Sequence, residues 1–231
     1  MEAIVLAGGR AERLGDAAAG RPKSLVDVAG KPLAAYQVGR LAAAGVTRVI
    51  FAVAAGDGAL FTSALAGLGP EVVTAEEPER LGRGGGIKFA ARLRRERGDV
   101  LALNGDELVD VDFGALLAAH RAHRALATIA VARPKSQFGI VDVDADDVVR
   151  GFEEAARVPY WVNCGNYVLT DEAIARFPDR GDHESTAFPE LASEGLLRAF
   201  RHDGLWLTVN TPKELRVARE HVEAHPEWLA A

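Results

Sequence analysis

Short apolar runs alternate with amphipathic stretches along almost the whole chain. The runs predict strands, each bounded by turn residues, at residues 2–6, 48–54, 71–74, 100–103, 125–132 and 161–169. Helices are expected between them, at 32–44, which starts with a proline and stops at a glycine, and at 87–97 and 113–124, where apolar residues recur at three and four positions. Alternating strands and helices predict a mostly parallel sheet with right-handed crossovers.

One region departs from this alternation. Residues 139–143 and 148–152 each alternate apolar and polar positions, and the acidic segment 144–147 separates them. This pattern predicts a β-hairpin. We expect the hairpin to form part of an acceptor pocket.

The composition favours a single catalytic domain. A chain of 231 residues with 48% hydrophobic content can bury one sizeable core, and it contains no linker, fixed-period repeat or low-complexity tract beyond its alanine richness. Its start is too short and acidic for a signal peptide, and no apolar run approaches the ~20 residues that span a bilayer. We therefore expect a cytoplasmic protein without a membrane partner.

Charge and cysteine content exclude several classes of function. The net charge of −6 argues against nucleic acid as a partner, yet the first 48 residues carry an excess of cations, which suits a small polyanion. The single Cys164 excludes an internal disulfide and is expected to be a buried core residue. The six histidines share no ligand spacing and are expected at the surface.

The segment after the first predicted strand carries phosphate-binding chemistry. Gly8 and Gly9 let the backbone turn and offer N–H groups to an anion, while Arg13 and Lys23 can neutralise the charge that the turn holds. Neither a Gly-x-x-x-x-Gly-Lys-Ser/Thr loop nor a Gly-x-Gly-x-x-Gly turn occurs there. The glycine pair by itself is equally compatible with a plain turn.

The longer pattern resembles the sugar-1-phosphate nucleotidyltransferases, whose opening reads L-A-G-G-x-G-T-R-L, P-K and G-K-P. The matching segments follow in order along nearly the whole chain: 6–14, Pro22-Lys23, Gly30-Lys31-Pro32, Glu77-Pro78, Leu81-Gly82, Gly84-Gly85-Gly86, Asn104-Gly105-Asp106, 163–167 and 206–212. The resemblance implies a Rossmann-like three-layer α/β/α fold with a mostly parallel sheet and a small hairpin insertion on the acceptor side. It also implies one domain over residues 1–231, with a nucleotide-binding half at 1–110 and a sugar-phosphate-binding half at 111–231.

The resemblance assigns roles to individual positions. Arg13 and Lys23 would be catalytic, and Asp106 would hold Mg²⁺. The nucleotide would contact Leu6, Ala7, Gly8, Gly9, Glu77, Gly85 and Asn104, and the sugar phosphate would contact Gly139, Glu154, Asn163 and Gly165. The glycine segment 81–86 would form a loop that passes over the base.

The implied reaction explains which residues are absent. A sugar 1-phosphate oxygen attacks the α-phosphorus of a nucleoside triphosphate and pyrophosphate leaves, so the nucleophile is already an anion and needs no general base. Carboxylate and phosphate oxygens are the ligands that Mg²⁺ prefers, which favours Asp106 as its ligand. Spacing alone would also allow a plain Asn-Gly turn with a solvated acid there.

The chain departs from the family pattern at several positions. Thr208 replaces the aspartate that the resemblance expects to share the metal. Three alternatives stay open: Asp106, the substrate phosphates and water complete the metal's ligand shell, a nearby acid such as Asp203 substitutes, or catalysis is weak or absent. Ala155 replaces a lysine expected to meet the sugar phosphate. Ala11 and Glu12 replace a glycine and a threonine in the first loop.

Likeness to branches that use GTP or UTP favours guanylyl transfer to a mannose-like or heptose 1-phosphate, with an N-acetylmuramate 1-phosphate as another acceptor. Two alternatives stay open. One is a binding or regulatory subunit that has lost turnover, and the other is a guanylyltransferase of the molybdopterin type. A homodimer also stays open, because the sequence assigns no patch to an interface.

Overall fold

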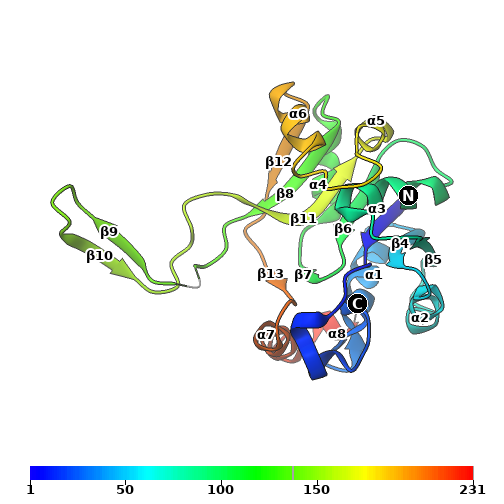
Figure 1. Ribbon diagram of the computed structural model, residues 1–231, viewed down its shortest axis with the longest axis horizontal. Coiled ribbons are helices and arrows are strands. Elements are labelled where there is room, and N and C mark those ends of the chain that lie inside the picture. The colour runs from blue at the N-terminus through cyan, green and yellow to red at the C-terminus, as the bar shows by residue number, and fades with distance from the viewer. Residues whose placement is uncertain (137, 231) are drawn as a thin grey trace.

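A seven-stranded sheet forms the centre of the computed structural model, which describes residues 1–136 and 138–230 (Figure 1). Its strands, in spatial order, are β12 (Leu197–Arg201), β8 (Ala127–Ala132), β11 (Val162–Leu169), β6 (Val100–Asn104), β1 (Glu2–Leu6), β4 (Arg48–Ala54) and β5 (Glu71–Glu77). Strand β11 runs antiparallel to both neighbours, and every other pairing in the sheet is parallel. The predicted mostly parallel sheet is therefore confirmed.

Helices cover both faces of this sheet. One core packs α1 (Leu33–Ala43), α2 (Gly58–Ala64) and α4 (Phe113–Arg121) against it, and a second packs α3 (Gly82–Ala90), α5 (Asp171–Ala175) and α6 (Ala187–Ser193). Alternation along β1 explains the two cores, because Ala3 and Val5 enter the first and Ile4 the second. The three-layer α/β/α architecture is confirmed.

A third apolar cluster joins the two ends of the chain. It contains Leu14, Val28 and Tyr36 from the first 40 residues and Leu215 and Trp228 from the last 20. The elements that contribute are α1, η1 (Glu12–Ala18), β2 (Asp27–Val28), β7 (Glu107–Val109), β13 (Trp206–Thr208), α7 (Pro212–Ala224) and α8 (Glu227–Ala230). Between η1 and α1 the chain also forms η2 (Lys23–Leu25) and β3 (Lys31–Pro32). This packing holds the loop after β1 beside the segment that follows β13.

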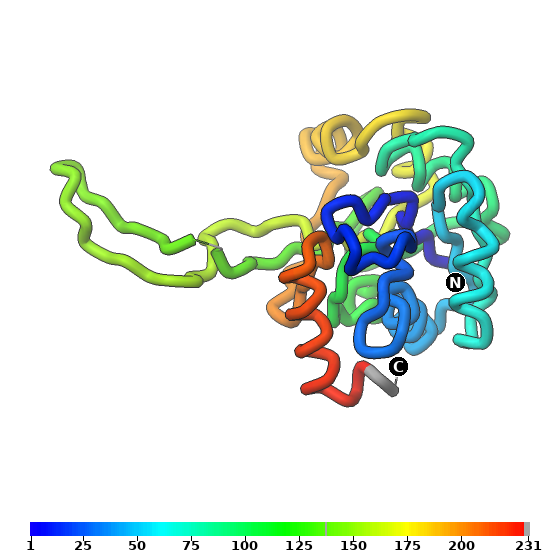
Figure 2. The backbone as a smooth tube through the Cα atoms, turned by 60° about the horizontal axis from the view of Figure 1, so that its bottom comes forward, coloured from blue at the N-terminus to red at the C-terminus, as the bar shows by residue number. Residues whose placement is uncertain are grey.

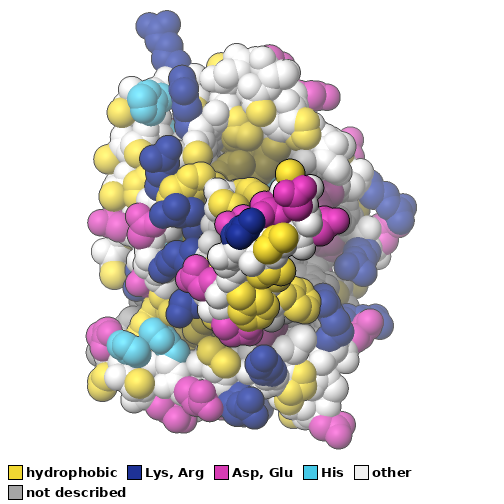
Figure 3. All heavy atoms as spheres, turned by 90° about the vertical axis from the view of Figure 1, so that its left-hand side faces the viewer, with side chains coloured by type: hydrophobic (Ala, Val, Ile, Leu, Met, Phe, Trp, Pro, Cys, Tyr) yellow, Lys and Arg dark blue, Asp and Glu magenta, His cyan; other side chains and the backbone are white. Residues whose placement is uncertain are grey.

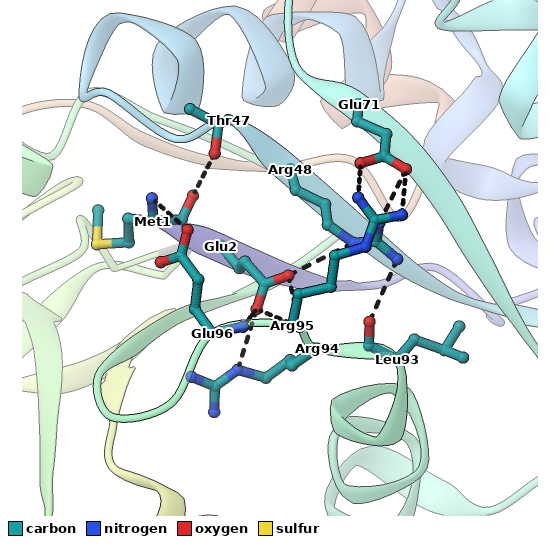
Figure 4. Close-up of polar contacts among 9 residues, drawn as sticks. All are labelled: Met1, Glu2, Thr47, Arg48, Glu71, Leu93, Arg94, Arg95 and Glu96. Atoms are coloured by element: carbon teal, nitrogen blue, oxygen red, sulfur yellow. Dashed lines mark hydrogen bonds and ion pairs between the residues drawn. The ribbon is translucent and has the colours of Figure 1, made fainter.

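Ion pairs hold the amino-terminal edge of the sheet, away from the ends of the strands that carry the predicted site residues (Figure 4). Arg48 Nη1 lies 2.8 Å from Glu71 Oε1, and Arg48 Nε lies 3.4 Å from Glu2 Oε1. The Glu2 carboxylate also accepts hydrogen bonds from the backbone N–H groups of Arg95 and Glu96, at 3.0 Å each to its nearer oxygen. These contacts join β1, β4 and β5 to the segment after η3 (Ala91–Leu93).

The predicted hairpin forms, as β9 (Ile140–Val143) and β10 (Val149–Glu153), but it projects from the body (Figures 1 and 2). We call residues 134–136 and 138–160 the arm. A bridge between Lys135 and Arg157 continues the ladder toward the body. At its base the guanidinium groups of Arg133 and Arg201 lie over the Trp161 ring, 4.8 and 5.3 Å from its centroid. The hairpin prediction is confirmed, whereas its expected place in the acceptor pocket is not what the structure shows.

Candidate active site

The carboxyl ends of β1 and β6 bring two predicted motifs together. The Gly105 N–H donates to the Leu6 carbonyl at 2.8 Å, and a Cβ at position 105 would lie 2.4 Å from that oxygen. A glycine is therefore required for the two strand ends to approach so closely. Asp106 follows directly, so its carboxylate stands beside the turn that contains Ala7, Gly8 and Gly9.

Lys23 lies at the centre of the site. Its backbone N–H donates to the Gly9 carbonyl at 3.4 Å, and its ammonium donates to Asp106 Oδ2 at 2.7 Å. The same ammonium donates to Asn210 Oδ1. The Lys23 side chain is 13% exposed and that of Asp106 is 32% exposed, so the pair lies at the surface of the site and can be reached by a ligand. The two residues predicted from separate motifs thus meet.

Asn210 is a site residue that the sequence did not predict. It lies in the segment 206–212, which resembles the family's W-x-D-x-G-T-P, and it stands at the position of the glycine. It is 187 positions from Lys23. The Val209 N–H donates to the Asp106 carbonyl at 2.9 Å, and the Asn210 N–H donates to Glu214 Oε2 at 2.7 Å, next to the capping box that starts α7. A polar side chain in place of that glycine was the only signal available.

The remaining residues of the first loop face solvent. Gly8, Gly9 and Arg13 are exposed, whereas Ala7 is buried and its N–H continues the sheet by donating to the Ala52 carbonyl at 2.8 Å. Within the described part of the chain the Arg13 guanidinium makes no hydrogen bond or ion pair. It is therefore available to an anion, although no contact joins it to Lys23 or Asp106.

Asn104 and Gly165, predicted from different motifs, lie against each other behind Asp106. Gly165 has φ +67°, and a Cβ there would lie 2.4 Å from Asn104 Nδ2. That amide donates to Glu107 Oε1 at 3.3 Å, and Gln37 Nε2 donates to the carbonyls of Asn104 and Glu107 at 2.8 and 2.9 Å. Burial, and then the charge of Asp106, raise the pKa of the Glu107 carboxyl well above its ordinary value.

Asn163 belongs to a separate polar network on the sugar-phosphate side. Its Nδ2 donates to Glu184 Oε1 at 2.8 Å and to the Tyr167 hydroxyl at 2.9 Å, while its Oδ1 accepts from the Gly165 N–H at 2.9 Å. Arg83 Nη2 lies 2.9 Å from Glu184 Oε2. Glu184 was not predicted, because its role depends on strand β11 and the 182–184 turn meeting in space.

The expected glycine loop over the base is wrong in its conformation. Helix α3 begins at Gly82, so Gly84, Gly85 and Gly86 are helical and buried. Glu77 ends strand β5, where its Oε2 accepts from the Leu81 N–H at 3.0 Å and burial raises the pKa of its carboxyl. Propensity favoured a loop for three consecutive glycines, but close packing against residues 178–183 outweighs it.

Two predicted sugar-phosphate residues are separated from the others. Gly139 and Glu154 flank the strands of the arm, and among the described residues no hydrogen bond or ion pair links either side of that hairpin to Lys23, Asp106 or Asn163. Ala155, at the family's lysine position, has φ +55°. Local alternation predicted the hairpin but contained no information about its direction.

The histidine expectation is wrong for three of the six. His120, His183 and His202 are buried, at 3, 0 and 8% exposure.

The expectation for Cys164 is confirmed: it is fully buried, its Sγ donates to the Ala130 carbonyl at 3.1 Å, and burial raises the pKa of its thiol to about 12. Such a thiol is protonated at neutral pH and is not a nucleophile.

The oxygen atoms that surround the Lys23 ammonium would suit a divalent cation as ligands. The carboxylate of Asp106 and the amide oxygen of Asn210 both approach one ammonium, so two oxygens already converge on one cationic centre. Carboxylate and amide oxygens are ligands of Mg²⁺, which keeps several waters and takes others from phosphates. In residues 1–136 and 138–230 no cluster of three His, Cys, Asp or Glu side chains offers an alternative metal site.

Comparison with known proteins places these features in a family context. Residues 2–225 match the family described as nucleotidyl transferase. The chain is 31% identical over 244 residues to the catalytic subunit beta of mannose-1-phosphate guanylyltransferase from Xenopus tropicalis, with 99% of this chain and 68% of the relative covered. It is 34% identical over 233 residues to mannose-1-phosphate guanylyltransferase from Mycobacterium tuberculosis, with 93% and 62% covered. The chain thus spans about two thirds of the length of these relatives.

Solved structures support the fold. HddC from Yersinia pseudotuberculosis superimposes with a TM-score of 0.74 at 24% identity, over 95% of this chain and 98% of HddC. The Bacillus anthracis structure described as a putative glucose-1-phosphate thymidylyltransferase gives a TM-score of 0.76 at 15% identity, over 96% of this chain and 95% of that protein. Of the helices in residues 1–136 and 138–230, none combines the length and apolar character needed to cross a membrane.

Proposed function

Because this chain belongs to the sugar-1-phosphate nucleotidyltransferase family, we propose that it transfers a guanylyl group from GTP to a mannose-like or heptose 1-phosphate and releases pyrophosphate. The observation that carries the proposal is the meeting of Lys23 with Asp106 beside the Gly8-Gly9 turn. The relatives at 31 and 34% identity are mannose-1-phosphate guanylyltransferases, which supports guanylyl transfer over uridylyl transfer and over a pterin acceptor.

The chain's own residues suit an in-line displacement. An oxygen of the sugar 1-phosphate forms a bond to the α-phosphorus while the bond to the pyrophosphate oxygen breaks, and no proton has to be removed from the nucleophile. The flexible ammonium of Lys23 follows the reacting phosphorus, and the exposed guanidinium of Arg13 neutralises the departing pyrophosphate. Burial raises the pKa of the Glu107 carboxyl behind them, which disfavours a further negative charge beside Asp106.

Mg²⁺ is the cofactor that we propose for this site. When bound, it neutralises phosphate charge and fixes the orientation of the triphosphate. Asp106 would hold it together with phosphate oxygens and water, while Asn104 and Gly165 form the wall behind. The cytoplasmic location expected from the sequence remains a prediction.

A matrix of nucleoside triphosphates against sugar 1-phosphates, assayed by pyrophosphate release with and without Mg²⁺, tests the proposal. We expect product with GTP and a mannose-like or heptose 1-phosphate. Lys23→Ala should lower kcat about a hundredfold or more, because a cation aimed at the transition-state charge is lost. Lys213→Ala, on the exposed face of α7, is the matched control and should leave the rate unchanged.

No product in any combination would contradict transferase activity. If a nucleotide sugar then raised the melting temperature of the protein, the binding-subunit alternative would replace it. The absence of a carboxylate at Thr208 is the observation that favours that alternative.

We also propose that the chain forms a homodimer through the arm. An isolated two-stranded hairpin is marginally stable in water, and exposed apolar side chains in a contiguous set indicate an interaction surface. Val141 and Val143 of β9 pair with Phe152 and Val149 of β10, and these four side chains are 45–68% exposed. In a two-fold dimer the same apolar face of a second copy would cover these side chains.

A further inference from the structure

We propose that Asn210 replaces the missing carboxylate as the second oxygen ligand of the cation site, and that the Lys23 ammonium occupies this site until the nucleotide arrives. The inference rests on the proposed function only in assuming that a divalent cation accompanies the triphosphate. It assigns a role to a residue that the family pattern gives as glycine.

The first step is geometric. The Lys23 ammonium donates to Asp106 Oδ2 at 2.7 Å and to Asn210 Oδ1, so a carboxylate oxygen and an amide oxygen surround one positive charge. The Lys23 ammonium is not what brings these two oxygens together, because backbone hydrogen bonds hold the segments that carry Asp106 and Asn210. Val209 N–H donates to the Asp106 carbonyl at 2.9 Å, and Asn210 N–H donates to Glu214 Oε2 at 2.7 Å.

The second step explains why position 210 can replace position 208. Thr208 is the last residue of β13 and pairs with Glu107, the residue next to Asp106. Asn210 follows two residues later, in the bend after β13, and its amide oxygen accepts a hydrogen bond from the Lys23 ammonium. Thr208 carries no carboxylate, but Asn210 presents an amide oxygen to the same ammonium as Asp106, and such oxygens are ordinary ligands of hard divalent cations.

The third step concerns charge. With Asp106 at −1, Lys23 at +1 and Asn210 neutral, the site is balanced without a metal. A divalent cation must therefore displace the ammonium from both oxygens, and only one of the two ligands that it then binds, the Asp106 carboxylate, is negatively charged. A triphosphate changes this balance, because its oxygens attract the ammonium and supply further ligands to the cation. The free protein should hold divalent metal weakly, and the metal should bind together with the nucleotide.

The test measures Mn²⁺ binding to the nucleotide-free protein by electron paramagnetic resonance of the free ion. Lys23→Met should tighten Mn²⁺ binding about tenfold or more, because it removes the competing cation. The double variant Lys23→Met with Asn210→Gly should lose this gain in Mn²⁺ affinity. The single variant Asn210→Asp should bind Mn²⁺ more tightly than the parent protein. Thr208→Ala is the control and should behave as the parent. Melting temperatures verify that each variant is folded.

Two results would overturn the inference: unchanged Mn²⁺ affinity in folded Lys23→Met, or equal affinities of Lys23→Met with and without Asn210→Gly. Both are independent of turnover. A protein that binds Mn²⁺ as expected but releases no pyrophosphate would retain this inference and contradict the proposed function, while the reverse outcome would contradict the inference alone.

Discussion

His183 is a titratable side chain in an apolar environment. Its ring is fully buried, stacks on Phe177 at 4.8 Å with an interplanar angle of 12°, and meets Tyr167 and Phe188 edge-on. Within the described residues neither ring nitrogen has a hydrogen-bond partner, and Nδ1 lies 3.9 Å from Asp182 Oδ1. Burial lowers the pKa of His183 to about 4.

This depressed pKa predicts acid sensitivity of the fold. The unfolded chain binds a proton at about pH 6.5, whereas the folded state resists it until about pH 4. The stabilisation from the neutral ring is therefore complete above pH 6.5 and is lost as the pH falls toward 4. Between pH 7 and 5 we expect a loss of about 2 kcal/mol from this residue.

Urea unfolding at both pH values measures this effect. His183→Leu should flatten the dependence of unfolding free energy on pH, whereas His123→Leu, at an exposed position after α4, should leave it unchanged. An equal pH dependence in His183→Leu and the parent would contradict this explanation.

The same residue shows what a sequence can and cannot predict at this scale. Lys23 and Asp106 were predicted because each lies in a motif whose chemistry is local. His183 was predicted at the surface because its neighbours Asp182 and Glu184 are charged, and no local pattern indicates that Phe177 and Phe188 enclose its ring. Asn210 escaped prediction because a contact across 187 positions defines its role.

At the scale of elements, helix α3 contains three consecutive glycines in its interior. A Cβ at Gly85 would lie 2.6 Å from the Asp179 carbonyl oxygen, and one at Gly84 would lie 2.8 Å from the His183 backbone nitrogen. These neighbours are backbone atoms, which cannot rotate away. The glycines therefore permit the helix to pack directly on the 178–183 segment, which also positions Glu184.

Gly85→Ala should consequently destabilise the protein by roughly 1–3 kcal/mol, the usual cost of overpacking, despite alanine's better helix propensity. Gly114→Ala is the matched control, since a Cβ in that exposed first turn of α4 meets only Asp112 Oδ1, at 3.2 Å. It should stay within about 1 kcal/mol of the parent. Midpoints of denaturant unfolding measure both, and equal midpoints would show that α3 can shift away from residue 179.

Helix α3 also shows why element boundaries were only partly predictable. Helix α1 was predicted within about a residue, because Pro32 and Gly45 mark its ends and apolar spacing fills its interior. The start of α3 was placed five residues late, at Ile87 instead of Gly82, because the glycines oppose a helix locally and only packing favours it. Local rules succeed where local and tertiary preferences agree.

At the scale of the molecule, two apolar layers and one joining cluster explain how distant motifs form one site. The strand and helix alternation predicted the layers, since the central strands β4 and β6 are apolar on both faces over most of their length. The third cluster was not predicted, although Leu14, Val28 and Leu215 hold the loop that carries Lys23 against the segment that carries Asn210. Its residues belong to short irregular elements without a clear periodicity.

Sequence periodicity predicted the hairpin of the arm but not the direction in which the arm projects from the body. Figure 3, viewed from the side on which the arm projects, shows hydrophobic and acidic side chains together on it. The apolar face of Val141, Val143, Val149 and Phe152 has the pairs Ile140–Glu153 and Asp142–Gly151 on its reverse. The Trp161 contacts at its base and the Lys135–Arg157 bridge hold the arm away from the body, so a second copy is a better cover for this face than the chain's own surface.

This argument predicts the oligomeric state. Val141→Thr together with Phe152→Ser should shift sedimentation from dimer to monomer, because the two substitutions remove paired apolar side chains that are 45 and 68% exposed in the single chain. The double substitution Asp142→Asn and Glu153→Gln changes the same number of side chains on the reverse face of the hairpin, and it should leave the dimer intact. If the parent protein sediments as a monomer at all concentrations, the homodimer proposal is contradicted. If the dimer survives the Val141 and Phe152 substitutions, the interface lies on another surface. The two faces of one hairpin thus supply both the test and its control.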